Sequence, residues 1–463
     1  MPTERPPSEP GTDPVTTIPP LRGRSSIALV LCCASLLIPG LAAATEWSAK
    51  PSVSLNLQHD SNLLLTSGPH ESVTGLTLAP MIDLSAQQEN WDITGSAELR
   101  NHRYWGQSGL NGNDQVYNFS SLYRTQRSTW QLGGSYAKES VTANTAFSPD
   151  IGLVSNQTQR ITRSINPSWT WQITERTQLQ LNYQTSLVSY QNIPNSSLID
   201  YTSRDGTATL SYELSHQNQL TVQLDRNYFA VPQESLSQLG QPSYTTLSGI
   251  LDPNPLVQSN TSITDSLILG WSHSFSQTLS TSFAAGARRT NSDSVVQTCT
   301  ASTPIAINLI TGLITGTCTQ TATTVSSDKS NGYVYNAEIS KQFELTDTSL
   351  TLGRQISPSG IGAQVQMDSA TLVVNHKLSA RLTSGLSLSD YQVRAIGGTA
   401  PTLTDENYVI ASTHLSWEWT RHLTVRAGYR YTTLNFLNRS VTAHDNVVYL
   451  RLDYAWRRFS ISR

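Results

Sequence analysis

The sequence has little charge, little cysteine and only one long apolar run. Asp, Glu, Lys and Arg make up 14% of the 463 residues, and hydrophobic residues make up 37%. Soluble globular domains average about a quarter charged residues. The net charge of −3 and the absence of a basic run argue against a nucleic-acid partner. Aromatic residues, at 8%, recur too regularly for a disordered chain.

The single apolar run lies near the N-terminus and predicts export. A polar extension ends in Arg22 and Arg24, the run "IALVLCCASLLIPGL" follows, and small residues precede Glu46. This order is typical of a secretory signal peptide with cleavage after Ala44. Lipidation at Cys32 or Cys33 is disfavoured because it would cut the apolar run in half. We therefore expect residues 1–44 to be an extension plus signal peptide, and residues 45–463 to form one domain.

The exported part alternates with period two. Segments such as "VSLNLQ", "WDITGSAEL", "LTVQLDRNY" and "VVYLRLDYAW" place apolar residues on one face and polar residues on the other. This is the periodicity of β-strands, and no segment sustains the periodicity of an amphipathic helix.

Short polar turns alternate with longer connections along the chain. The turns lie near residues 89–90, 216–219 and 420–422, and the longest connections span 230–260 and 290–331. The count gives about 18 strands, with both mature ends on the short-turn side. The sequence predicts an all-β fold, a transmembrane up-and-down antiparallel β-barrel with short periplasmic turns and long extracellular loops.

Tryptophan placement supports the same prediction. Trp91 and Trp130 begin strands just after short turns, whereas Trp271, Trp417 and Trp456 end strands near them. Amphipathic rings prefer the membrane–water interface, so a girdle at one level indicates a bacterial outer-membrane location.

No motif predicts catalysis, a metal or a cofactor. The nine histidines are scattered without metal-ligand spacing, and no nucleophile elbow or phosphate-binding glycine loop is present. We expect the protein not to be an enzyme and to hold no cofactor.

Charged residues on the polar face of predicted strands are candidates to line the lumen. Hairpin pairing predicts that Glu418 lies diagonal to Arg426, and that Arg430 lies near Arg451 and Asp453. Such pairs would either stiffen the wall or select solutes, and balanced signs favour the first. Neutral amides and hydroxyls, such as Gln180 and Thr221, dominate the other lumen positions. The charged candidates are Asp92, Glu98, Arg100, Glu418, Arg426, Arg430, Arg451 and Asp453.

Two cysteines remain in the exported part, and both lie in the longest predicted outer loop. Cys299 and Cys318 sit in near-identical Thr-Cys-Thr triplets. In an exported protein this arrangement predicts a structural disulfide.

The start of the exported part resembles a known family. The step His59-Asp60-Ser61-Asn62 followed by three leucines is similar to the first strand of porin-like outer-membrane barrels associated with exopolysaccharide and exosortase systems. The sequence departs from that family at His59, where a tyrosine is usual. The resemblance implies an outer-membrane channel or scaffold that assists polymer export.

The favoured function is a conduit for exopolysaccharide or oligosaccharide, restricted by the loops 230–260 and 290–331. A structural or adhesive barrel with a blocked lumen and an outer-membrane enzyme are the alternatives. The expected partners are outer-membrane lipid, lipopolysaccharide, the barrel-assembly machinery and polysaccharide export components.

The C-terminus is unusual for a barrel. The closing segment "LDYAWRRFSISR" continues four residues beyond its last aromatic, Phe459. It resembles the stub of another hairpin, and two outcomes are open. Ser460–Arg463 trails in the periplasm, or the stub extends the ladder beside the first strand.

Overall fold

A computed structural model describes residues 45–106, 108–141, 158–191, 198–231, 243–245, 255–308, 313–360, 362–396, 405–436 and 441–462. The predicted extension and signal peptide, residues 1–44, lie outside these ranges. Within the described part, no helix has the length and hydropathy that a membrane span needs.

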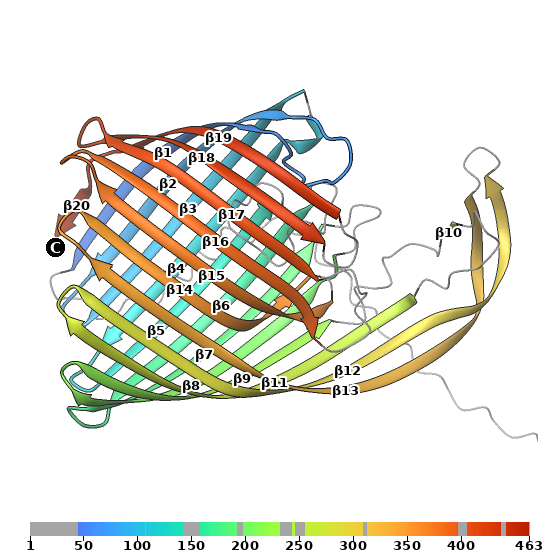
Figure 1. The fold of residues 1–463 in the computed structure, drawn as a ribbon, viewed down its shortest axis with the longest axis horizontal. Helices are drawn as coiled ribbons and strands as arrows, with labels where there is room; N and C mark the ends of the chain where they lie inside the picture. Colours follow the sequence, from blue (N-terminus) through green and yellow to red (C-terminus); the bar gives the residue numbers. More distant parts are fainter. Residues whose placement is uncertain are drawn as a thin grey trace, which may run out of the picture. The chain divides into compact units, whose positions relative to one another are not determined.

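The described chain forms a closed antiparallel wall of 18 strands, β1–β9 and β11–β19, which confirms the predicted fold class. Consecutive strands pair, and β19 returns to pair with β1 (Figure 1). Two short strands, β10 and β20, add to β13 and β1. The first half of the wall comprises β1 Glu46–Asp60, β2 Val73–Gln87, β3 Trp91–Trp105, β4 Gly112–Arg124, β5 Ser128–Ser140, β6 Gln159–Gln172, β7 Thr177–Tyr190, β8 Tyr201–Ser215 and β9 Asn218–Val231. The remaining strands are β10 Ser243–Thr245, β11 Pro255–Ser276, β12 Leu279–Asn308, β13 Leu313–Gln342, β14 Thr346–Ser359, β15 Ala363–Lys377, β16 Leu382–Ile396, β17 Glu406–Glu418, β18 Leu423–Phe436, β19 Val441–Ala455 and β20 Phe459–Ser462.

The period-two pattern sorts side chains between two faces. On β9, Leu220, Val222 and Leu224 are exposed, while the alternate residues Phe229 and Val231 further along are buried. Because successive strand residues point to opposite sides, the exposed apolar set forms the lipid face and the alternate set forms the lumen face. Strands form here because one face can meet hydrocarbon while every backbone group is bonded within the closed wall.

The two ends of the barrel differ. Tight turns gather at one end, where Ser215 and Asn218 border the β8–β9 turn and Ser276 and Leu279 border the β11–β12 turn. By the convention for such barrels this end is periplasmic. At the other end β12 and β13 continue beyond their neighbours as a long hairpin (Figure 1). Residues 290–331 were predicted as a loop, and most of them instead continue these two strands, because their β-branched residues favour extended pairing.

The C-terminal segment continues the closing strand. Ala455 of β19 pairs with Ser52, and after a register shift of one residue Phe459 of β20 pairs with Ala49. Both segments run antiparallel to β1, so β20 continues the edge that β19 pairs with, after the register shift, and is not the stub of a new hairpin. Of the two predicted outcomes, the ladder beside the first strand is the one observed.

Candidate functional site

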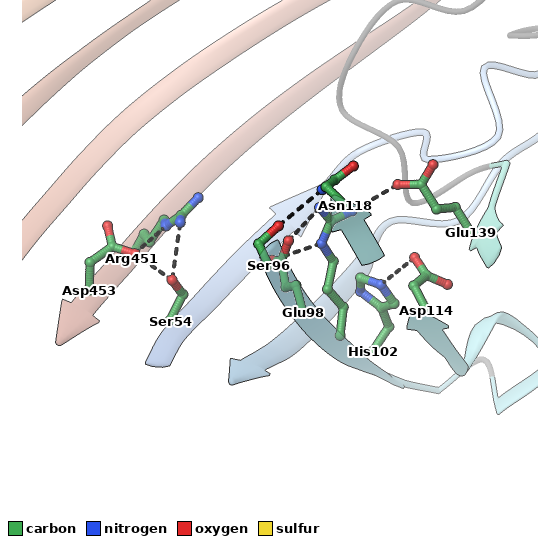
Figure 2. A network of polar contacts seen from close by, with 10 residues as sticks. Ser54, Ser96, Glu98, His102, Asp114, Asn118, Glu139, Arg451 and Asp453 are labelled. Atoms are coloured by element: carbon green, nitrogen blue, oxygen red, sulfur yellow. Dashed lines mark hydrogen bonds and ion pairs between the residues drawn. The ribbon is translucent and has the colours of Figure 1, made fainter. Parts of the chain in front are cut away.

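The lumen of the barrel is the candidate functional site. Paired charges project into it from neighbouring strands (Figure 2). Arg100 Nη2 lies 2.9 Å from Glu98 Oε2, and Arg100 Nη1 lies 3.0 Å from Glu139 Oε1 on β5. The sequence predicted Glu98 and Arg100 as lumen residues but not Glu139. Only the register of β3, β4 and β5 shows that Glu139 lies close to Arg100.

A second charged group lies where β19 meets β1. Arg451 Nε donates to Asp453 Oδ1 at 2.7 Å, and Ser54 Oγ donates to the same oxygen at 2.6 Å. Arg426, rather than Arg430, stands opposite Arg451 in the β18–β19 register. The predicted proximity of Arg430 to this group is therefore wrong.

Arg430 lies further up the lumen, opposite Val447. The hairpin register of β17–β18 pairs Glu418 with Thr424, so Glu418 stands diagonal to Arg426 as the pairing argument expects. Near the short-turn end, Arg124 Nη1 lies 2.5 Å from Asp92 Oδ2.

A buried hydrogen-bonded row crosses four strands beside the Glu98 group. Asp114 Oδ2 lies 2.9 Å from His102 Nε2, and His102 Nδ1 lies 2.9 Å from Thr77 Oγ1. The side chains of His102 and Asp114 are 6% and 3% exposed. Asp114 also accepts a bond from the Ser140 amide. The row joins the upper ends of β2 to β5, and sequence reasoning did not find it.

The wall splits between β13 and β14. Their pairing begins at Gln342 with Asp347 and ends at Tyr335 with Arg354. Beyond that rung β13 stays with β12, while β14 stays with β15 as far as Ser359. At the fork the Arg354 guanidinium lies 4.2 Å from the centre of the Tyr333 ring and pairs with Asp368.

Beyond the fork, the end of the β14–β15 hairpin turns into the barrel. We call residues 356–360 and 362–366 the inserted tip. Gln364 is fully buried; its amide donates to Asn227 of β9, and its carbonyl accepts from Thr264 Oγ1 of β11 at 2.9 Å. Arg288 of β12 donates to Gln366 at 3.3 Å. Strands β9, β11 and β12 are not ladder neighbours of β15, so these bonds cross the interior.

The turn of the inserted tip is also anchored. The Ile199 amide donates to the Gly360 carbonyl at 2.7 Å, and Asn260 Nδ2 donates to the Gly362 carbonyl at 2.9 Å. Gly362 has a φ of +83°, and an added Cβ would come within 3.3 Å of Ile199. Both the backbone conformation and the close approach therefore require glycine here. Beside it, burial raises the pKa of the Asp200 carboxyl.

Apolar side chains surround the inserted tip on the lumen face. Val365 and Met367 pack with Tyr408 and Leu434, and Leu65 packs against this cluster from the loop after β1. A second cluster forms around Val188, Leu198 and Phe229 on the other side. The outer half of the lumen is thus packed like a core, whereas the lower half is polar.

The motif after β1 builds one wall of this packing. Asp445 accepts bonds from the Ser61 hydroxyl and the Asn62 amide at 3.1 and 2.8 Å. The Asn62 side chain bonds both backbone groups of Thr66, which holds Leu65 at a φ of 47°. The segment from His59 to Asn62, which resembles a family motif, therefore leads into a turn whose leucines pack inside the lumen.

Two predicted features stay untested. The side chains of Cys299 and Cys318 lie outside the described residues, and the backbone register places these residues opposite Thr321 and Ser302. Of the predicted restricting loops, 232–242 and 246–254 also lie outside the described part. The inserted tip was missed, although its signal is visible on β15, where the lipid-face set that pairs with Leu350 and Leu352 continues as Asp368, Gln366 and Gln364.

One family model matches part of the chain. Residues 42–223 match surface lipoprotein assembly modifiers. This range runs from the start of β1 into β9 and covers less than half of the chain. A comparison with curated proteins gives no match.

Several solved outer-membrane proteins resemble the barrel. The ferric-catecholate import receptor Fiu from E. coli K12 aligns over 88% of this chain and 81% of its own, with 10% identity and a TM-score of 0.48. OccAB3 from Acinetobacter baumannii aligns over 89% and 99%, with 10% identity and a TM-score of 0.43. OccK2 from Pseudomonas aeruginosa, solved with glucuronate, aligns over 88% and 98%, with 11% identity and a TM-score of 0.41.

The closed wall and its lipid face make this protein a β-barrel of the bacterial outer membrane.

Proposed function

We propose that the protein is a gated outer-membrane conduit and that the structure describes its closed state. The observation that carries the proposal is Gln364, a fully buried amide that ties the inserted tip to β9 and β11 across the interior. An 18-strand barrel is wide enough for an aqueous lumen unless something fills it. Here a hairpin of the wall itself fills the outer half.

The tip is held by a small set of contacts, which suits a gate. Each hydrogen bond between the tip and the wall contributes on the order of 1 kcal/mol net. A few such bonds together with partial apolar burial give a gap of a few kcal/mol between closed and open states, a range that a solute or partner can shift.

The proposed solute is a neutral oligosaccharide or exopolysaccharide. The lumen wall supports this choice where its charges pair with one another, as Arg100 does with Glu98 and Glu139. Neutral amides and hydroxyls on the same face would hydrogen-bond sugar hydroxyls without retaining an ion. Polysaccharide export components are the proposed partners.

Conductance of the purified barrel in planar bilayers tests the proposal. We expect rare openings in the wild type and frequent openings once the inserted tip is loosened, with neutral sugars reducing the open current. If the barrel still conducts no current after removal of the tip, the lumen is blocked by other residues, and the structural or adhesive alternative is favoured.

A second candidate function is surface lipoprotein assembly, because the family model for such modifiers matches residues 42–223. The fork between β13 and β14 favours it, since a seam in the wall would let a lipid-bearing chain leave sideways. Co-expression with a surface lipoprotein, followed by protease shaving of cells, would show whether display depends on this barrel. Unchanged display excludes this candidate.

We propose no catalytic step. The His102 imidazole bonds both Asp114 and Thr77 and is almost entirely buried, so both ring nitrogens are occupied by structural partners. Incubation with ester and peptide substrates, with a His102→Gln variant as control, tests this statement. A hydrolytic activity that this variant loses would support the enzyme alternative.

A further inference from the structure

The lipid face carries a second feature that the conduit does not use. An open depression of about 880 Å³ lies across β7, β8, β9, β11, β12 and β13. One cross-strand row of lipid-face residues forms its apolar part. That row is Leu181, Ala208, Leu224, Leu267 and Ala287, each paired with the next in the ladder.

The next row toward the outer end is polar and charged instead of apolar. It runs from Gly206 through Arg226, Asp265 and Arg289 to Asn331. Arg226 Nε lies 2.7 Å from Asp265 Oδ1, and the Arg226 side chain is 71% exposed. A row of Leu and Ala bordered by a row that carries Arg226, Asp265 and Arg289 marks the upper boundary of the hydrocarbon layer on this side of the barrel.

The row above adds two more cations on the same face. Arg204 stands 5.5 Å from the centre of the Tyr228 ring, and the ladder continues from Tyr228 through β11 and β12 to Lys329. Arg204 and Lys329 therefore flank Arg226 and Arg289 at the level where the head groups of outer-leaflet lipids lie.

Small residues shape the depression beneath the cations. At Gly206 an added Cβ would meet only the Arg226 carbonyl oxygen, at 4.0 Å, so the space outside it is open. Ala208 and Ala287 leave similar room between Leu181, Leu224 and Leu267. An acyl chain can lie in such a depression while an anion is held above it.

We propose that this surface is a binding site for a phosphorylated, acylated glycolipid of the outer leaflet. Arg226 and Arg289 would bind a phosphate by charge-assisted hydrogen bonds, and the apolar row would receive an acyl chain. Charge complementarity selects this occupant: Arg204, Arg226, Arg289 and Lys329 surround Asp265, the one carboxylate of these two rows, so a neutral lipid would leave the excess positive charge unbalanced at the membrane boundary.

Native mass spectrometry of the full-length protein in detergent tests the site, with lipid A as the probe and phosphatase-treated lipid A as its neutral counterpart. The wild type should bind the phosphorylated form about tenfold more tightly, as charge-assisted bonds predict. The double variant Arg226→Gln/Arg289→Gln should lose this preference. Arg103→Gln, an exposed lipid-face position on β3, is the matched control and should keep it.

Two further variants separate binding from structural effects. Gly206→Leu should fold, because its surroundings are open, and should weaken both lipid forms by filling the depression. Asp265→Asn frees the Arg226 guanidinium and should preserve or strengthen binding of the phosphorylated form.

Four results would overturn the site, three of them from the wild type, the double variant and the control. These are equal binding of both lipid forms by the wild type, a double variant that keeps the preference, and an Arg103→Gln protein that loses it. Loss of the preference in Asp265→Asn would also overturn it, because Arg226 would then act only as a partner of Asp265.

Discussion

The periplasmic and outer halves of this barrel are built from the same hairpins but use them differently. In the periplasmic half each strand keeps its neighbour, apolar residues face lipid and polar residues face the lumen. In the outer half the β12–β13 hairpin runs on past the wall while the end of β14–β15 turns inside (Figure 1). The lumen-face residues there, such as Val365 and Met367, are apolar and packed. On β15, Gln364 and Gln366 continue the lipid-face set while Val365 and Met367 continue the lumen-face set, so this strand leaves the wall where its two faces exchange polarity.

Removing the inserted tip should have the largest effect on the difference between the two halves of the lumen. Ile356 and Gln366 form one rung of the β14–β15 ladder, so residues 357–365 can be replaced by an Asn-Gly turn, which suits two-residue hairpins. The outer half should then be as open as the lower half. We expect sustained conductance in planar bilayers where the wild type opens rarely. Wild-type behaviour in the shortened protein would mean that the tip is not the gate.

Much of the regular half could be predicted from the sequence, because alternation and turns are local signals. The strand count, the closure and the lipid face depend on alternating patterns such as "LTVQLDRNY", and each such pattern indicates a strand wherever it occurs in the chain. The tip could not be predicted with equal ease, because its partners Asn227 and Thr264 lie far along the chain. Arg430 was misplaced for a related reason: Arg451 pairs with Arg426, four residues before Arg430, and only the observed register fixes that offset.

A single substitution in the tip should give a smaller effect of the same kind. Gln364→Ala removes two buried hydrogen bonds and leaves Asn227 and Thr264 with fewer partners, at a cost of roughly 1–3 kcal/mol to the closed state. Open probability should rise on the order of tenfold to a hundredfold. Gln131→Ala, on the lumen face of β5, is the matched control and should leave gating unchanged. An equal rise in both variants would indicate general loosening of the barrel rather than release of the tip.

The closing seam offers a comparison within the periplasmic half. Deleting Phe459–Arg463 leaves Glu46–Ala49 of β1 without the β20 ladder, while Ser52–Asp60 keep β19. The loss of one short ladder at an edge should lower the unfolding temperature by several degrees and slow membrane insertion. Heat-modifiable migration on gels measures both. Deleting Arg463 alone should change neither, and normal assembly of the longer deletion would show that β20 is dispensable.

The smallest effect is expected for the charged pair beside that seam. Arg451 and Asp453 are 43% and 28% exposed, so water screens their attraction, and the pair contributes less than about 1 kcal/mol. Arg451→Gln should therefore change the unfolding temperature little. Arg100→Gln should cost more, because it leaves Glu98 and Glu139, which are 23% and 17% exposed, without their shared cation. Thermal unfolding of both variants side by side tests this order. The reverse order would show that the lower lumen is held together at the β1–β19 seam rather than across β3 to β5.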